Sequence, residues 1–263
     1  MRGIAIASLS LASVAGAAPP QDSVEPICTD RPGKSSSTCT VPKGMWQVES
    51  SFADWSLTKA DGSRSTSLAI GSTALKYGLS GDMHVELAAA PYVRNRERSD
   101  EARSTASGFG DVTVKLKRRV TAADAVFSAA LVPFVKLPTA PKRLGNGKVE
   151  AGLVLPLSWA LAETLSLSSS PELDLIADAG GDGYHAAGAT TLSLGFAATD
   201  RLALAAELWT GWDWDEDSSR QTSIGGNAAY KLSDDLQIDG QVDFGLTRDS
   251  ADLELSGGVS VRF

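Results

Sequence analysis

Apolar and polar residues alternate along most of the chain, and the alternation is clearest in residues 236–247. In that stretch, LQIDGQVDFGLT, the even positions from Leu236 to Leu246 are apolar or glycine, and the odd positions are polar or glycine. A repeat of two residues places side chains on opposite faces of a β-strand, and a helix does not keep it. Residues 251–263 repeat the pattern, so the two stretches predict a hairpin that turns at 248–250.

Similar stretches recur from residue 44 to the end of the chain. They predict strands at 44–57, 64–78, 82–94, 107–119, 125–137, 148–160, 164–177, 185–198, 201–213, 219–232, 235–247 and 251–263. Tight turns alternate with longer connections around 58–63, 95–106, 138–147, 178–184 and 214–218. Bacterial outer-membrane barrels have short periplasmic turns, longer extracellular loops and both termini on the periplasmic side. A soluble sandwich gives no reason for this asymmetry. We predict that residues 44–263 form an all-β, transmembrane, antiparallel up-and-down barrel of about twelve strands, of the outer-membrane type.

The first residues predict export. One positive charge at Arg2 precedes an apolar stretch that ends near Val14, and the small residues 15–17 form an A-x-A cleavage site, so residues 1–17 read as a signal peptide. No later run of about 18 apolar residues could form a spanning helix, and only helices and closed barrels satisfy every backbone group in lipid. We therefore expect the bacterial outer membrane as the location, and outer-membrane lipid, lipopolysaccharide and the barrel-assembly machinery as partners.

Residues 18–43 are predicted to be a periplasmic N-terminal segment that is rich in Pro, Gly and Ser. It contains both cysteines of the chain, Cys28 and Cys39. In an oxidising periplasm, an even pair that encloses a short loop favours a disulfide. A zinc site would need four ligands, and no histidine accompanies the pair.

Aromatic residues lie mostly near the predicted strand ends. One set would lie near the periplasmic boundary (Trp46, Tyr77, Trp159, Phe196, Tyr230 and Phe263) and another near the outer one (Trp55, Tyr92, Phe134, Tyr184, Trp212 and Trp214). Two such girdles are typical of a barrel in a bilayer, although core aromatics of a soluble protein are the alternative. Phe263, which follows Val259 and Val261, is similar to the signal by which outer-membrane barrels are recognised for insertion.

Composition excludes few classes of protein. Hydrophobic residues make up 43% and charged residues 21%, values that suit a soluble enzyme and a barrel equally. The formal net charge of −8 argues against nucleic acid as a partner, because phosphate binding needs clustered Lys and Arg.

If the apolar faces point to lipid, the lumen receives charged residues of both signs. The lumen candidates are Glu49, Lys76, Glu86, Asp111, Lys115, Lys136, Glu150, Glu172, Asp174, Glu207, Lys231, Asp239, Asp243, Glu254 and Arg262. They could form a mutually paired, hydrated interior, or a charged conduction path of the kind that sets selectivity in pores. Twelve strands lie between filled eight-stranded barrels and wide porins, so any channel would be narrow.

Catalytic, metal and phosphate sites find little support. The two histidines, His84 and His185, fall near opposite rims of the predicted barrel, so they are not expected to share a site. Neither is followed by a serine in a His-x-Ser arrangement, so we expect no enzyme. A Ser-His pair from distant strands leaves a membrane hydrolase as an alternative. Two acidic loops offer oxygen ligands for Ca²⁺ without EF-hand spacing, and solvated loops are the alternative; they carry Asp213, Asp215, Glu216 and Asp217, and Asp178 and Asp182. We expect no cofactor and no metal.

Two stretches of the chain resemble a known family. Cys28-Thr-Asp-Arg-Pro-Gly-Lys34 with Val41-Pro-Lys-Gly44 and Gln47-Val-Glu49, and later Val135-Lys-Leu-Pro-Thr139 through Gly147-Lys148 to Leu155-Pro156, are similar to the outer-membrane transporters named for the meta-pathway of phenol degradation. The resemblance runs from about residue 28 to the C terminus. It implies a barrel related to channels for small hydrophobic or aromatic compounds, and it supplies no catalytic residues.

The favoured hypothesis is therefore passive diffusion of small molecules through a narrow charged lumen. A structural or surface-interaction barrel with a plugged lumen is the alternative. Asp30 and Arg31 could pair with lumen charges and hold residues 18–43 as a plug, or the segment could be a periplasmic tail held by its disulfide.

Overall fold

The computed structural model describes residues 25–60, 62–122, 125–178, 183–215 and 219–263. The signal peptide predicted at 1–17 lies outside the described residues. No helix in the part of the chain that is described is long and apolar enough to cross a membrane.

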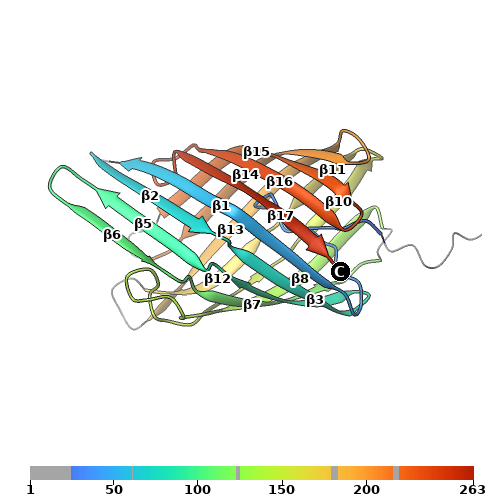
Figure 1. Cartoon of the computed structure of the whole chain (residues 1–263), viewed down its shortest axis with the longest axis horizontal. Coiled ribbons are helices and arrows are strands. Elements are labelled where there is room, and N and C mark those ends of the chain that lie inside the picture. The colour runs from blue at the N-terminus through green and yellow to red at the C-terminus, as the bar shows by residue number, and fades with distance from the viewer. Residues whose placement is uncertain (1–24, 61, 123–124, 179–182, 216–218) are drawn as a thin grey trace, which may run out of the picture.

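Period-two alternation gives one antiparallel sheet of twelve barrel strands (Figure 1). Seven strands are continuous: β1 (Trp46–Ala60), β8 (Phe127–Leu137), β13 (Tyr184–Ala197), β14 (Leu202–Asp213), β15 (Ser219–Ser233), β16 (Leu236–Gly245) and β17 (Leu253–Arg262). Five are interrupted and form the pairs β2 (Ser63–Ile70) and β3 (Thr73–Ser80), β4 (Met83–Ala89) and β5 (Tyr92–Arg98), β6 (Arg103–Gly108) and β7 (Val112–Arg119), β9 (Glu150–Val154) and β10 (Leu157–Ala162), and β11 (Leu165–Ser169) and β12 (Glu172–Ala177).

The interruptions coincide with residues that do not suit a regular ladder. Gly71, with a φ of 70°, separates β2 from β3. Pro91, Pro156 and Pro171 lie between the halves of three other strands, where a missing N–H removes a ladder bond. Neighbouring strands pair across these points, so the sheet stays continuous.

The sheet closes on itself through its first and last strands. β1 pairs with β17 from Gln47↔Arg262 to Leu57↔Leu253, and on its other side with β2 and β3. Trp46 and Phe263 exchange two backbone hydrogen bonds, of 2.8 and 2.9 Å, beyond the last ladder pair. Closure gives each described strand except β6 a partner on both sides, as a sheet in lipid requires, and β6 pairs with β5 alone in the hairpin at the outer end. The predicted twelve-stranded barrel is confirmed.

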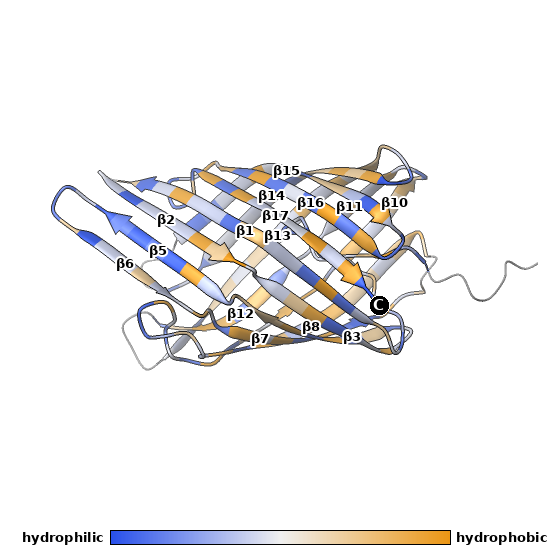
Figure 2. Cartoon of the chain, viewed as in Figure 1, coloured by the Kyte–Doolittle hydropathy of each residue, from blue (hydrophilic) through white to orange (hydrophobic). Residues whose placement is uncertain are grey.

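Apolar and polar residues alternate along the strands (Figure 2), and their burial places the apolar side chains outside the barrel and the polar ones inside. On β14, Leu208 is 43% exposed while its neighbour Glu207 is 4% exposed. Most of the buried residues are likewise polar or charged, among them Gln47, Glu49 and Lys76. This is the inverse of a soluble protein, and it fits an outer face that meets lipid.

Two predicted loops are largely strand. Of the loop predicted at 58–63, residues 58–60 belong to β1 and Ser63 begins β2. Residues 95–106 form most of the hairpin of β5 and β6, which turns through a 2.9 Å hydrogen bond from Ser99 N to Ala102 O. The prediction ended the strands where the apolar face ends. The backbone ladder continues beyond it because strand pairing needs no apolar face once the hairpin is in water. This hairpin lies at the end of the barrel opposite the C terminus (Figure 1).

Candidate functional site in the barrel lumen

Residues 25–43, which we call the inner segment, lie inside the barrel near the end that holds the C terminus. The backbone N–H of Ile27 donates to Asp234 O at 2.6 Å, and that of Val41 donates to His84 Nδ1 at 3.1 Å. The Thr38 and Ser128 hydroxyls are 2.7 Å apart on another side of the lumen. Because outer-membrane barrels keep their termini on the periplasmic side, the segment fills the periplasmic half of the interior.

A disulfide joins Cys28 to Cys39, as the sequence predicted. It closes a loop within the inner segment. Inside that loop, the Asp30 carboxylate accepts hydrogen bonds from the Ser37 backbone N–H at 2.8 Å and from its hydroxyl at 2.9 Å. The segment therefore has a fixed shape although it has no regular secondary structure.

Asp30 is at the centre of a charge network that joins the segment to the wall. Its two carboxylate oxygens are each 2.6 Å from a lysine ammonium, one of Lys76 and one of Lys117. Lys76 also lies 2.5 Å from Glu49 and 3.8 Å from Glu86. All four wall residues are buried. Buried charges are stable only when paired, so the segment completes the charge balance of this part of the lumen.

Two further cations of the segment pair with acids on other strands of the wall. Arg31 lies 2.8 Å from Asp239 on β16. Lys34 forms an ion pair with Glu254 on β17, and its backbone N–H donates to Glu207 on β14 at 2.9 Å. The segment thus spans the lumen from Lys117 on β7 to Glu207 on β14.

The other lumen candidates line the lumen around the charge network of Asp30. Lys115 is 3.2 Å from Glu86, and Lys136 is 3.3 Å from Asp111 and 2.7 Å from Glu150. Glu172, Asp174, Lys231 and Asp243 line inner cavities, and Arg262 pairs with Asp235 of a periplasmic turn at 2.6 Å. The interior is therefore a mixed-charge surface with many internal ion pairs.

Sequence reasoning missed three residues that matter here. Lys117 is two residues after the candidate Lys115, and His84 is two before the candidate Glu86, so strand alternation places both on the inner face. Lys34 carried no such signal, because the inner segment has no periodic pattern.

Two aromatic rings face inward. Phe134 was expected in the outer girdle, but it pairs with Gly152 and lies on the same face of β8 as Lys136. The Lys34 ammonium lies 4.9 Å from the centre of the Trp209 ring. The prediction that Phe134 belongs to the outer girdle is therefore wrong. The strand register places its ring on the inner face of the barrel and not toward lipid.

The inner segment divides the free space of the lumen. One cavity of about 660 Å³ lies between the segment and β10, β11 and β13–β15. Two others, of about 430 and 360 Å³, lie on the sides that carry Lys115 and Glu254. Arg31 of the segment lines all three cavities.

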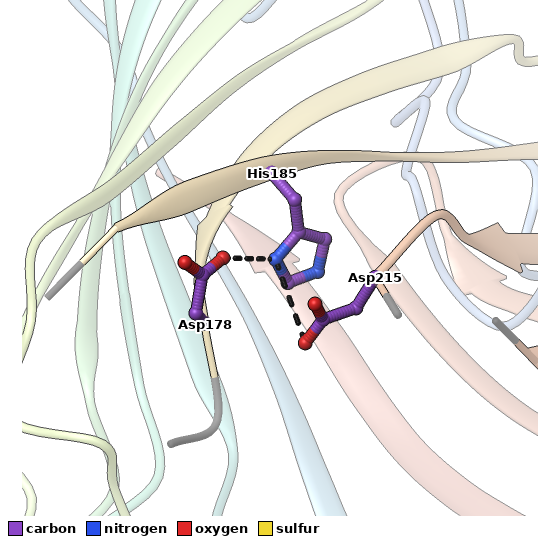
Figure 3. Close-up of side chains that lie close together, drawn as sticks. All are labelled: Asp178, His185 and Asp215. Atoms are coloured by element: carbon purple, nitrogen blue, oxygen red, sulfur yellow. Dashed lines mark hydrogen bonds and ion pairs between the residues drawn. The ribbon is translucent and has the colours of Figure 1, made fainter. Parts of the chain in front are cut away.

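At the outer rim, the structure brings together two loops that the sequence treated separately (Figure 3). His185 Nδ1 is 2.7 Å from Asp178 Oδ1 and 3.9 Å from Asp215 Oδ2, while its Nε2 is 2.9 Å from Asp213 Oδ1. Carboxylates at both ring nitrogens favour a protonated imidazole. One potential ligand atom from each of Asp178, His185 and Asp215 lies within 4.8 Å of the others, so these three could hold a cation only with the imidazole deprotonated. The candidates Asp182, Glu216 and Asp217 lie outside the described residues.

Comparisons with known proteins agree with this architecture. The sequence profile of the family described as Putative MetA-pathway of phenol degradation matches residues 29–263. The solved COG4313 outer membrane channel from Pseudomonas putida F1 has a TM-score of 0.68 and 17% identity, over 88% of this chain and 99% of that one. The NanC porin has a TM-score of 0.53 and 12% identity, over 82% and 98%. The β domain of the Bordetella autotransporter BrkA has a TM-score of 0.52 and 12% identity, over 85% and 100%. No curated protein matches the sequence. The fold and location are those of an outer-membrane β-barrel.

Proposed function

Because the chain belongs to the family described as Putative MetA-pathway of phenol degradation, we propose that it is a passive outer-membrane channel for small molecules. One observation carries the proposal: a closed, lipid-facing barrel encloses cavities lined by charged and polar side chains of both signs. Charged groups that line a lumen interact with solutes and set selectivity.

The path is narrow. A twelve-stranded barrel is already smaller in diameter than a porin, and the inner segment further reduces the free space to separate cavities. Diffusion therefore requires a small solute, and for most solutes it requires displacement of part of the segment.

Hydrophobic or aromatic compounds are the class of solute that we propose. The family description refers to phenol degradation. The inward rings of Phe134 and Trp209 offer flat apolar surfaces, and the Lys34 ammonium beside Trp209 could pair with an acidic substituent. Aromatic compounds with one polar group suit such walls better than aliphatic hydrocarbons.

A barrel with a blocked lumen is the second candidate function. The ion pairs of Asp30, Arg31 and Lys34 favour it, because they tie the inner segment to opposite walls. Such a barrel would serve as a structural or surface-interaction protein.

Planar-bilayer conductance and liposome swelling separate the two candidates. The test uses the folded wild-type protein and the variant D30N/R31Q, which removes the charges that hold the segment. The control D82N/R118Q removes one acid and one base that face each other at 3.7 Å on the periplasmic turns, where both side chains are exposed. We expect conductance in the wild type, a clear increase in D30N/R31Q and no change in the control. If neither the wild type nor D30N/R31Q conducts or takes up solute, the barrel is blocked and the channel proposal is wrong.

A further inference from the structure

A second charged surface lies on the outside of the barrel, at the end opposite the C terminus. On β5, Asn95 accepts a hydrogen bond from Ser67 at 2.9 Å, and Ser67 lines the inner cavity beside Glu254. Because side chains alternate along a strand, Arg94, Arg96 and Arg98 point outward.

Cross-strand register builds these arginines into a row of cations. Lys59 of β1 pairs directly with Arg64 of β2, Arg64 pairs with Arg98 of β5, and Arg98 pairs with Arg103 of β6. Arg96 lies on the same face two residues before Arg98 on β5, between Thr66 and Thr105. We call Lys59, Arg64, Arg94, Arg96, Arg98 and Arg103 the outer cationic face.

Such a row is unfavourable in an isolated barrel. Like charges directly opposite one another on neighbouring strands destabilise the pairing. Among the residues that the structure describes, no ion pair joins any member of the outer cationic face to a carboxylate. This differs from the lumen, where the cations Lys76, Lys115 and Lys136 each face an acid. The arrangement therefore calls for an anion from outside the chain.

The position of the outer cationic face relative to the lipid-facing apolar band indicates where that anion would lie. One step toward the membrane, Arg94 pairs with the outward Leu68, which pairs with Trp55. The next outward pair, Ile70 and Tyr92, is apolar and exposed. The cations thus begin where the lipid-facing apolar band ends, as the polar colours of β5 and β6 show in Figure 2. With the termini in the periplasm, this boundary belongs to the outer leaflet.

We propose that the outer cationic face binds the phosphate groups of lipid A, the lipopolysaccharide anchor that forms the outer leaflet of Gram-negative outer membranes. Strands are about 4.8 Å apart, so the four cations from Lys59 to Arg103 span about 14 Å, a length that suits phosphates at both ends of a disaccharide. Arginine forks bind phosphate oxygens in bidentate geometry. Acyl chains of the same lipid would contact the apolar band below.

Titration of the full-length folded barrel with purified lipid A in detergent, followed by calorimetry, tests this surface. The variant R96Q/R98Q is compared with the wild type and with R118Q/R201Q, which removes two exposed arginines at the periplasmic end. A basic residue at an anionic lipid surface contributes about a fivefold change in affinity, so R96Q/R98Q should bind about 25-fold more weakly. The control should bind as the wild type does. Heat-modifiable migration checks that all three proteins are folded.

Further probes identify the chemistry of the ligand. Lipid A from which the phosphates have been removed should bind at least as weakly to the wild type as intact lipid A binds to R96Q/R98Q. Phosphatidylglycerol in the same detergent should bind more weakly than lipid A, because it has one phosphate and no disaccharide. Equal lipid A affinity for the wild type and R96Q/R98Q, equal affinity for dephosphorylated lipid A, or equal affinity for phosphatidylglycerol would each overturn the proposal. None of these results depends on whether the lumen conducts.

Discussion

The periplasmic half of the lumen and the outer cationic face contain similar groups in opposite circumstances. In the lumen, Asp30 of the inner segment lies between Lys76 and Lys117, and buried cations are met by acids of the same chain. On the outer cationic face, four cations stand side by side across four strands, and none of them forms an ion pair in the described structure. Charges that the fold encloses are neutralised internally, because desolvation penalises an isolated ion, whereas charges at the membrane surface are left for an external partner.

The largest difference between the two regions should appear when one cation is removed from each. Replacing Lys76 with Met leaves Asp30, Glu49 and Glu86 close together without their shared cation. Breaking a buried ion pair in this way lowers the free energy of unfolding by about 3–5 kcal/mol. The same substitution at the exposed Arg96 should change it by less than about 0.5 kcal/mol. Urea unfolding of the barrel in liposomes, followed by tryptophan fluorescence, measures both values. Similar losses for K76M and R96M would remove the distinction between the two regions.

Sequence reasoning could predict one of these regions better than the other. Alternation predicted the barrel, because the apolar face of a lipid-exposed strand repeats every second residue, and it also placed Lys76 and Glu49 inside. It left Arg31 open between a lumen plug and a periplasmic tail, and it did not single out Lys34, since the inner segment has no period and its contacts come from strands up to 220 residues away. It also missed the outer cationic face, because the outward row exists only through the register of β1, β2, β5 and β6, and residues 95–106 were assigned to a loop.

The next largest effect concerns the disulfide of the inner segment. The variant C28S/C39S opens a loop of about a dozen residues. A disulfide that closes a loop of that size raises the free energy of the unfolded chain by about 3 kcal/mol. We expect a loss of about 2–3 kcal/mol in the free energy of unfolding. Hydrogen exchange should increase at residues 27–41 and stay unchanged in the hairpin 92–108. Equal changes in both places would mean that the disulfide stabilises the whole barrel and not the segment alone.

The smallest effect should have the opposite sign. Arg98 lies directly between Arg64 and Arg103, so R98Q relieves two repulsive cross-strand pairs. In detergent without lipopolysaccharide, the hairpin of β5 and β6 should become more stable by about 0.2–1 kcal/mol, measured by slower hydrogen exchange at 96–105. Added lipid A should protect the wild-type hairpin more than the R98Q hairpin, because bound phosphate neutralises the row only where the arginine is present. The sign of the R98Q effect should therefore reverse between the two conditions. If R98Q destabilises the hairpin in both, the cations stabilise the fold by contacts within the chain, and the contrast between lumen and surface does not hold.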